Sequence, residues 1–233
     1  MRVQQRTLCD VYYFLCVYCG HSLTHSLTCL LTFAHFNRYA LAIAAVTGNE
    51  VTVQGVGSQS LQGDANFCRA LEKMGCEVKQ TKTSTTVRGP SGKNGLEAID
   101  IDMMTMTDAF MTLAAVAAVS NGVTKITGIA NQRVKECDRI AAMVRVINFS
   151  FVIYNHTNSS HKNQVRELAK CGVQAWELED GIAIRGRATS SQEDKETKRI
   201  FCYNDHRIAM SFAVLSSRIP NITILDKECT DKT

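Results

Sequence analysis

The sequence lacks a strong excess of charge of either sign, and it is poor in proline. Its 233 residues contain 26 Lys and Arg against 22 Asp and Glu, a formal net charge of +4. That excess is too small to indicate a nucleic-acid-binding arm, although it would favour an anionic small substrate if it were concentrated in a cleft. With only 2 prolines and 45% hydrophobic residues, the composition excludes a disordered chain. The length suits one large domain or two small ones.

The cysteines lack a regular spacing. There are 10 of them in a chain that is long enough to build a core without disulfides. We therefore expect reduced thiols in a cytoplasmic protein, with a plastid as the alternative location. Cys16, Cys19, His21 and His25 lack the long spacer that separates the ligand pairs of a zinc finger. The sequence thus predicts no metal site and no cofactor.

Residues 1–38 form an atypical N-terminal segment, and residues 11–36 contain no Asp, Glu, Lys or Arg. His, Ser and Thr interrupt this stretch, whereas a membrane span needs about 20 predominantly apolar residues. No convincing signal-peptide cleavage site follows the apolar part. We expect no membrane association, and a membrane-anchored protein remains an alternative for this segment.

An internal repeat organises the rest of the chain. An Ala-rich apolar helix, a break and a short β-branched strand occur three times. A second element, a helix with a glycine cap followed by a β-hairpin, occurs twice. The repeated unit is therefore helix, strand, helix, strand, strand, which predicts an α/β fold. The first element covers residues 41–54, 108–127 and 206–225, and the second covers residues 70–89 and 167–186.

The spacing of the repeat indicates an insertion. Gly48 and Gly75 are 27 residues apart, whereas the equivalent Gly122 and Gly172 are 50 apart. Residues 144–164 nearly account for the difference, and they run from β-branched residues into Asn, Ser and His. We hypothesise that they are a translated intron or a lineage-specific loop. A mature transcript that retains these codons would contradict the intron interpretation.

Removal of the insertion would join residues 140–143 to residues 165–170 as one amphipathic helix. The segment also carries N-x-S/T sequences at Asn148, Asn155 and Asn158. In an intracellular protein these are chance matches to the glycosylation motif.

Three polar clusters lie at the junctions of the repeat. Asp108 opens an Ala-rich helix, where the simplest interpretation is a helix cap or first-turn carboxylate. Residues 131–139 and 203–207 place cations at the starts of two further helices. Cations are unfavourable at the positive end of a helix unless an anion is bound, although a solvated helix start is the competing interpretation. The clusters therefore predict a ligand with more than one anionic group.

Five motifs carry a resemblance to a known family: SLQGDANF, MTDAF, IANQRVKECDRIAAM, YNDHRIAMSF and ECTDKT. Among them, RVKE-x-DR followed by NDHR-x-AM is highly specific. From about residue 39 to residue 233, apart from the insertion, the chain resembles the 5-enolpyruvylshikimate-3-phosphate synthase family. It is most similar to the synthase region of pentafunctional AROM polypeptides. The resemblance implies an inside-out, barrel-like α/β domain of βαβαββ units, of which residues 39–233 are the later part.

The resemblance also implies an activity. The family transfers the enolpyruvyl (1-carboxyvinyl) group of phosphoenolpyruvate to the 5-hydroxyl of shikimate 3-phosphate and releases phosphate, without a metal or cofactor. The motifs also imply the site residues. Asp108 would be the proton acceptor near the 5-hydroxyl, and Glu136 or Lys135 would be the proton donor. The ligands of shikimate 3-phosphate would include Asn131 and Lys135, and those of phosphoenolpyruvate would include Arg139, Arg207 and Lys232. Cys229 lies at a cysteine position singled out in AROM-type members.

The chain departs from the family at its N-terminus. The Lys-Ser pair, the arginines and the Ser-Ser-Gln motif of the family's other domain have no counterpart in residues 1–38. We therefore expect about half a site, little or no activity of this chain alone, and dependence on a missing N-terminal domain or a parent multifunctional chain. A non-catalytic remnant that binds phosphorylated ligands and a UDP-N-acetylglucosamine enolpyruvyl transferase remain alternatives.

Overall fold

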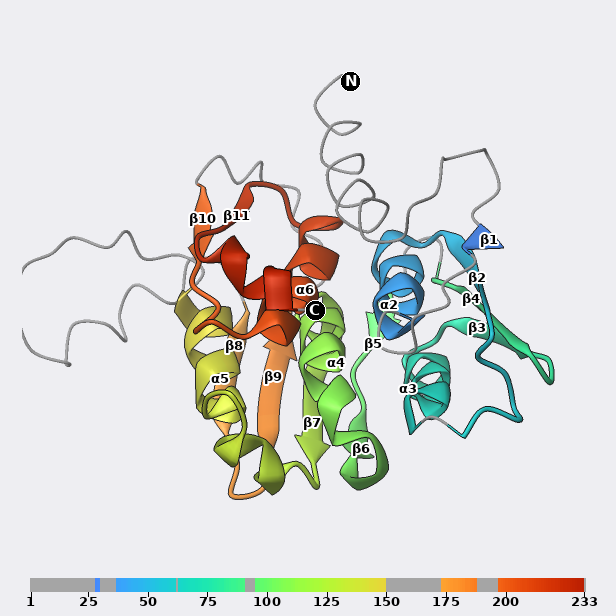
Figure 1. The fold of residues 1–233 in the computed structure, drawn as a ribbon, viewed down its shortest axis with the longest axis horizontal. Coiled ribbons are helices and arrows are strands. Elements are labelled where there is room, and N and C mark those ends of the chain that lie inside the picture. The colour runs from blue at the N-terminus through green and yellow to red at the C-terminus, as the bar shows by residue number, and fades with distance from the viewer. Residues whose placement is uncertain are drawn as a thin grey trace, which may run out of the picture.

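The computed structural model describes residues 28–29, 37–61, 63–90, 95–149, 173–187 and 197–232. Within them, one order of elements occurs twice in full and a third time in part (Figure 1). The first unit consists of β1 (Thr28–Cys29), α2 (Asn37–Thr47), β2 (Glu50–Gln54), α3 (Phe67–Lys73), β3 (Glu77–Gln80) and β4 (Ser84–Arg88).

The second unit follows the same order, with its first strand in two pieces. It consists of β5 (Leu96–Glu97), β6 (Asp100–Asp102), α4 (Phe110–Ala117), β7 (Ser120–Thr127), α5 (Arg139–Phe149), β8 (Gln174–Glu177) and β9 (Ile182–Gly186). The third unit contributes β10 (Lys198–Ile200), α6 (His206–Ser216) and β11 (Ile222–Ile224). Short 3-10 helices connect these elements: η1 (Gly63–Asn66), η2 (Met104–Ala109), η3 (Ala130–Val134) and η6 (Lys227–Lys232).

The strand pairing is equivalent in the units. β1 pairs in parallel with β2, β6 with β7, and β10 with β11, so each first helix connects two parallel strands. β2 then pairs antiparallel with β4, and β4 with β3; β7 pairs in the same way with β9, and β9 with β8. The predicted α/β fold is confirmed, as are both hairpins. Because the third unit stops at two strands in the described residues, the sheets do not close into a barrel.

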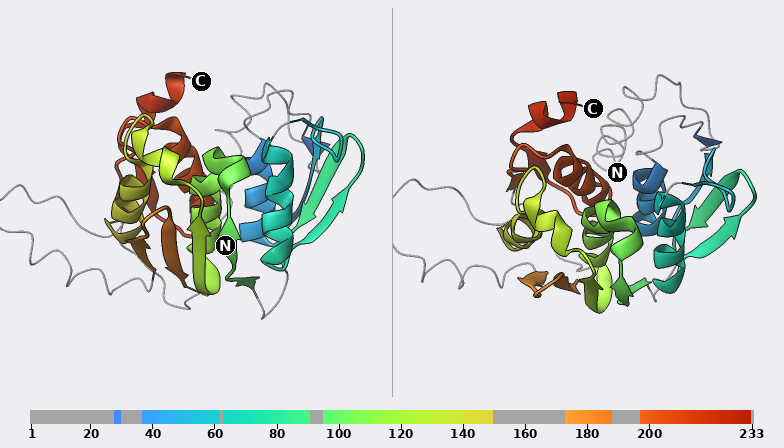
Figure 2. Two further views of the ribbon diagram at one scale, coloured as in Figure 1. Left: turned by 90° about the horizontal axis from the view of Figure 1, so that it is seen from below. Right: turned by 60° about the horizontal axis from the view of Figure 1, so that its bottom comes forward.

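Helices lie inside and sheets outside. The first helices of the three units, α2, α4 and α6, contact one another, and α4 also packs on β7 and β9 (Figures 1 and 2). Every residue of α4 is buried, as expected for a helix that is apolar on all sides except at Thr112. The second helices are peripheral: α3 packs on β3 and β4, and α5 packs on β8. The core therefore lies between the inner helices and the sheets.

Gly89 and Gly186 occupy equivalent positions, at the end of the last hairpin strand of the first and second units. Gly89 directly follows β4, and a Cβ atom on it would lie 2.3 Å from the carbonyl oxygen of Ala44 in α2. Gly186 ends β9, and a Cβ atom on it would lie 2.3 Å from the carbonyl oxygen of Ala117 in α4. Only glycine allows the hairpin strand to approach the inner helix so closely.

The first described helix starts close to the domain boundary predicted at residue 39, and that boundary stays a prediction. α2 begins at Asn37, and Arg38 is buried with its guanidinium over the Tyr39 ring, 4.8 Å from the ring centroid. Thr28 and Cys29 supply the parallel strand β1. Part of the atypical N-terminal segment thus pairs with β2 in the sheet of the first unit. The remainder of that segment, including the two cysteines and two histidines considered above, lies outside the described residues. No helix in the described part of the chain is both long and apolar enough to cross a membrane.

α5 continues through residues 144–149, which are the first residues of the predicted insertion. Ile140, Met143 and Ile147 recur at helical spacing, and all three are buried. These residues include β-branched ones, and their apolar period is that of a helix. Residues 150–172 lie outside the described residues, so an insertion within them stays a hypothesis.

Asn148 ties the end of α5 to the sheet. Its Nδ2 donates to the carbonyl oxygen of Ala175 in β8, and its Oδ1 accepts from the Ala175 amide, both at 2.7 Å. We expect Asn148→Ala to lower the free energy of unfolding by about 1–3 kcal/mol, because it leaves both groups of Ala175 without partners. Urea denaturation measures this. Asn66→Ala is the control, since Asn66 is exposed and makes no capping hydrogen bond; an equal loss in both variants would contradict the prediction.

Candidate active site

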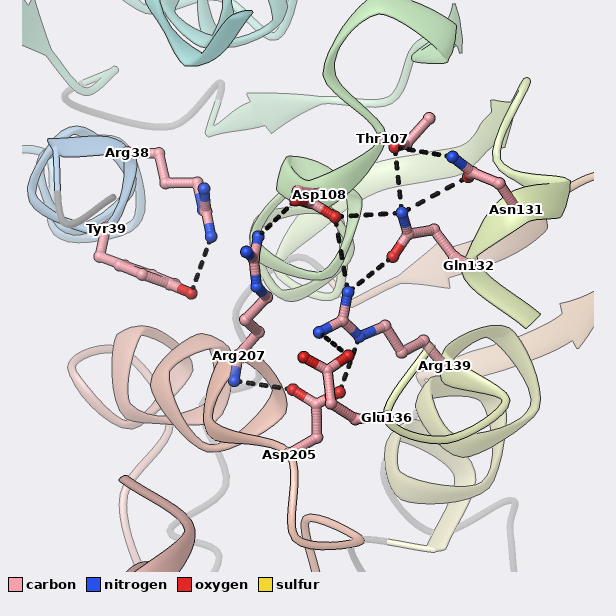
Figure 3. Close-up of polar contacts among 10 residues, drawn as sticks. All are labelled: Arg38, Tyr39, Thr107, Asp108, Asn131, Gln132, Glu136, Arg139, Asp205 and Arg207. Carbon is pink, nitrogen blue, oxygen red and sulfur yellow. Dashed lines mark hydrogen bonds and ion pairs between the residues drawn. The ribbon is translucent and has the colours of Figure 1, made fainter. Parts of the chain in front are cut away.

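The three polar clusters predicted from the sequence meet where helices of two units begin (Figure 3). Asp108 lies in η2 directly before α4, Arg139 is the first residue of α5, and Arg207 is the second residue of α6. Asp205 precedes α6 and caps it, with its Oδ1 accepting from the Arg207 amide at 2.9 Å. The packing of α4 against both α5 and α6 therefore assembles this site.

Arg139 is a buried cation at the centre of the cluster, with a side chain that is 1% exposed. Its Nε donates to Asp205 Oδ2 at 2.7 Å, its Nη2 lies 2.5 Å from Glu136 Oε2, and its Nη1 lies 3.5 Å from Asp108 Oδ1. A buried charge requires such partners. The unfavourable position of a cation at a helix start is thus offset by carboxylates of the protein itself.

Arg207 faces the same carboxylate from the other side. Its Nη1 lies 3.0 Å from Asp108 Oδ2, and its side chain is mostly buried. Within the described residues, Arg207 Nε, Arg207 Nη1 and Arg139 Nη2 are buried without a hydrogen bond of good geometry. Arg139 Nη2 and Arg207 Nη1 lie at ion-pair distance from Glu136 and Asp108, so an additional acceptor would compete with these carboxylates, whereas Arg207 Nε has no acceptor in the described residues.

Asp108 is held in its ionised form. Burial by itself would raise the pKa of its carboxyl, but the charges of Arg207, Arg139 and Lys135 and a hydrogen bond from Gln132 together lower the pKa below its usual value. The helix-cap interpretation of Asp108 is wrong, because Ala109 takes the N-cap position of α4 and no side chain caps it. Asp108 instead lies in η2, which turns its carboxylate toward the two arginines.

The other predicted polar residues surround this carboxylate. Lys135 ends η3, is exposed and acts on Asp108 through its charge. Asn131 is exposed, and its Nδ2 donates to Thr107 Oγ1 at 3.3 Å. Glu136 is half exposed beside Arg139. The structure thus brings together six of the residues implied by the motifs: Asp108, Asn131, Lys135, Glu136, Arg139 and Arg207.

The two remaining predicted residues lie in η6, which packs on α6. Cys229 is buried, and its amide donates to the carbonyl oxygen of Asp226 at 3.2 Å. The Cys229 thiol lies close enough to Cys202 to contribute, after burial and Asp226, to a raised pKa of the Cys202 thiol. A catalytic role of Cys229 stays a prediction. The side chain of Lys232 lies outside the described part of the chain.

Arg133 has a structural role rather than an anion-binding one. Its Nη1 lies 2.6 Å from Glu177 Oε2 and 3.2 Å from Asp138 Oδ2, and its Nη2 donates to the carbonyl oxygen of Leu178 at 3.0 Å. Asp138 in turn accepts from the Ala141 amide in the first turn of α5. These contacts fasten the segment that carries Lys135 and Glu136 to the β8–β9 hairpin.

Sequence reasoning assigned no role to two buried residues of the site, Asp205 and Gln132. Both side chains are fully buried. Asp205 had a local signal, because an aspartate directly before an apolar helix is a common N-cap. Gln132 had none, since a neutral amide beside five charged residues looks like part of an exposed polar segment.

Comparison with known proteins agrees with this arrangement. The family model of EPSP synthase (3-phosphoshikimate 1-carboxyvinyltransferase) matches residues 37–150 and 145–233, two segments that overlap at residues 145–150. The pentafunctional AROM polypeptides of Schizosaccharomyces pombe and Yarrowia lipolytica are 52% and 49% identical to this chain over 204 and 197 residues. Each match covers 84% of this chain but only 12% and 11% of the respective relative.

Solved structures agree as well. EPSP synthase from Acinetobacter baumannii is 25% identical, with a TM-score of 0.62, over 83% of this chain and 41% of that one. The enolpyruvyl transferase NikO from Streptomyces tendae, at 14% identity, shares the fold with a TM-score of 0.52 over 82% of this chain and 38% of that one. The chain thus spans less than half of these solved relatives. Since its motifs, its repeated units and the family model all coincide, the chain belongs to the EPSP synthase family.

Proposed function

We propose that this chain carries one half of an active site that transfers the enolpyruvyl group of phosphoenolpyruvate to the 5-hydroxyl of shikimate 3-phosphate. One observation supports this most strongly. Arg139 and Arg207 flank the single carboxylate of Asp108, and their guanidinium groups retain buried donors without well-directed hydrogen bonds in the described residues. Guanidinium pairs of this kind suit a ligand that carries both a carboxylate and a phosphate.

The chemistry requires two proton-transfer groups in opposite protonation states. The 5-hydroxyl attacks C2 of phosphoenolpyruvate and loses its proton, while C3 gains a proton. The tetrahedral intermediate then loses a proton from C3 and expels phosphate. Asp108 is ionised at neutral pH and would accept the hydroxyl proton, although its lowered pKa makes it a weaker base than an ordinary aspartate. Glu136 or Lys135 would supply the proton to C3.

Ligand binding would exchange partners within the cluster. Asp108 and Glu136 lie next to the same guanidinium groups that phosphoenolpyruvate would contact. An incoming carboxylate or phosphate would therefore compete with these side chains for Arg139 and Arg207. That exchange would free Glu136, which is half exposed, to turn toward the substrate.

The other half of the site would come from a complementary domain. The solved relatives are more than twice as long as the part that this chain matches. We propose that a second domain, on the same polypeptide or on a partner, supplies the remaining ligands of both substrates. Turnover would then require both halves.

Titration calorimetry tests the proposal without the need for turnover. We expect phosphoenolpyruvate to bind the 233-residue chain weakly, and more tightly when shikimate 3-phosphate is present. Arg207→Met should raise the Kd of phosphoenolpyruvate by about 30-fold or more, because removal of a desolvated charge partner costs at least about 2 kcal/mol.

Arg88→Met is the matched control. Arg88 lies on β4, where it forms an exposed pair with Glu50, and its loss should leave binding unchanged. No heat from either ligand at millimolar concentration, or equal effects of the two arginine variants, would contradict the proposal.

A further inference from the structure

We infer that Gln132 is a positioning residue that holds the carboxylate of Asp108 and the guanidinium of Arg139 at a set distance from each other. The catalytic significance of this bridge rests on the proposed function, but the bridge itself can be tested separately.

Gln132 uses both ends of its amide inside the cluster (Figure 3). Its Oε1 accepts from Arg139 Nη1 at 2.9 Å. Its Nε2 donates to Asp108 Oδ1 at 3.1 Å and to Thr107 Oγ1 at 3.0 Å, with Asn131 Oδ1 at 3.4 Å. The side chain is fully buried, so its orientation is set by these partners rather than by water.

The distances show that the amide, rather than direct pairing, links the two charged groups. The direct contact between Arg139 Nη1 and Asp108 Oδ1 is 3.5 Å, at the limit of a hydrogen bond, whereas both bonds of Gln132 are of normal length. An amide accepts from the guanidinium through its oxygen and donates to the carboxylate through its nitrogen at the same time, which an ionised glutamate or a methionine cannot do. A glutamate here would repel Asp108, and a methionine would leave both groups without this partner.

The bridge also gives the two oxygens of Asp108 different partners. Oδ1 is held by Gln132, while Oδ2 lies toward Arg207 at 3.0 Å. Without the bridge, the carboxylate could rotate onto Arg139 and form a direct bidentate pair, which is the stronger geometry for these two groups. Gln132 thus keeps Oδ2 of the proposed base next to Arg207.

The titration of Asp108 gives a readout that a merely structural residue would not change. The groups that act on it are Arg207 of α6, Arg139 of α5, Lys135 after η3, and the donated hydrogen bond of Gln132. That bond favours the ionised form, so its removal should raise the pKa of Asp108 toward the usual value. The acidic limb of any pH profile that depends on ionised Asp108 should move to higher pH.

The experiment follows the Asp108 side-chain carboxyl carbon by NMR during a pH titration of the 233-residue chain, with the resonance assigned by its loss in Asp108→Asn. We expect a higher pKa of Asp108 in Gln132→Met. A larger increase is expected in Gln132→Glu, which keeps the shape of the side chain and its acceptor for Arg139 and so provides a second variant if the methionine variant does not fold.

Gln80→Met is the matched control. Gln80 is a partly buried glutamine whose Nε2 donates to Thr85 Oγ1 at 3.0 Å in the β3–β4 hairpin, outside the cluster. It should leave the pKa of Asp108 unchanged. An Asp108 titration in the folded Gln132 variants that matches the unsubstituted chain would overturn the inference.

Calorimetry with phosphoenolpyruvate separates this inference from the proposed function. A raised pKa of Asp108 in the Gln132 variants with no phosphoenolpyruvate binding by the unsubstituted chain would support the bridge and reject the function. Phosphoenolpyruvate binding by the unsubstituted chain, with an unchanged pKa of Asp108 in the variants, would reject the bridge and leave the function intact.

Discussion

Replacement of Asp205 by alanine is expected to lower the free energy of unfolding by roughly 3–5 kcal/mol. Asp205 is fully buried, and its Oδ2 accepts from Arg139 Nε at 2.7 Å. The substitution would remove a main partner of a guanidinium that is itself 1% exposed. It would also remove the N-cap of α6, a contribution of about 1 kcal/mol.

Two further substitutions separate these contributions. Asp205→Asn retains a good N-cap residue but loses the charge, so the difference between the asparagine and alanine variants estimates the cap. The double variant with Arg139→Met and Asp205→Ala should lose less free energy of unfolding than the two single variants lose together. Both charges of the pair are then absent, so neither is left buried without the other. Urea denaturation of each variant measures these free energies.

Asp100→Ala serves as the control for a surface pair. Asp100 lies on β6, 3.7 Å from Lys125, and both side chains are more than half exposed. Its loss should change stability by less than about 0.5 kcal/mol. An Asp205→Ala variant that is destabilised no more than Asp100→Ala would show that the buried pair does not hold α5 and α6 together.

The second large effect is expected on catalysis. Asp108→Asn should lower kcat by about 10²–10⁴, the range for loss of a general base, in an assay that supplies the complementary domain. Phosphoenolpyruvate should bind as tightly as before or more tightly, because the substitution removes a carboxylate that competes for Arg139 and Arg207. Single-turnover kinetics and calorimetry measure the two effects separately.

Asp180→Asn is the control for this prediction. Asp180 is exposed in the turn between β8 and β9, where its Oδ2 accepts from the Gly128 amide. It should leave kcat and phosphoenolpyruvate binding nearly unchanged. A parallel loss of binding and turnover in Asp108→Asn would indicate that Asp108 holds the arginines in place rather than acting as the base.

Features of the fold that depend on near neighbours in the chain could be predicted. The two hairpins and the apolar inner helices have local patterns, and the structure confirms them. The short parallel strands β6 and β10 had no such pattern in their three residues. They are strands because β7 and β11 lie beside them. The same reason explains the length of α5, since burial of Ile147 and the bonds of Asn148 to β8 hold residues 144–149 in the helix.

For the site, the motifs located Asp108, Arg139 and Arg207 but not the contacts among them. The contacts that connect the cluster include Arg139 with Asp205, 66 residues away, and Gln132 with Asp108, 24 residues away. Gln132 appeared as part of an exposed polar segment, although its side chain is fully buried and it bridges two charged groups. Burial of a polar side chain is a property of its surroundings, which a local pattern does not contain.

The sequence by itself determined that this protein is an α/β chain of repeated units with the motifs of one family, because secondary structure and turn geometry follow from residues a few positions apart. Only the tertiary structure decided that three carboxylates surround Arg139, that Asp205 rather than Asp108 caps a helix, and that Gln132 lies between Asp108 and Arg139. Those relations depend on how α4, α5 and α6 pack, and the packing sets the distances on which charge pairing and proton affinity depend.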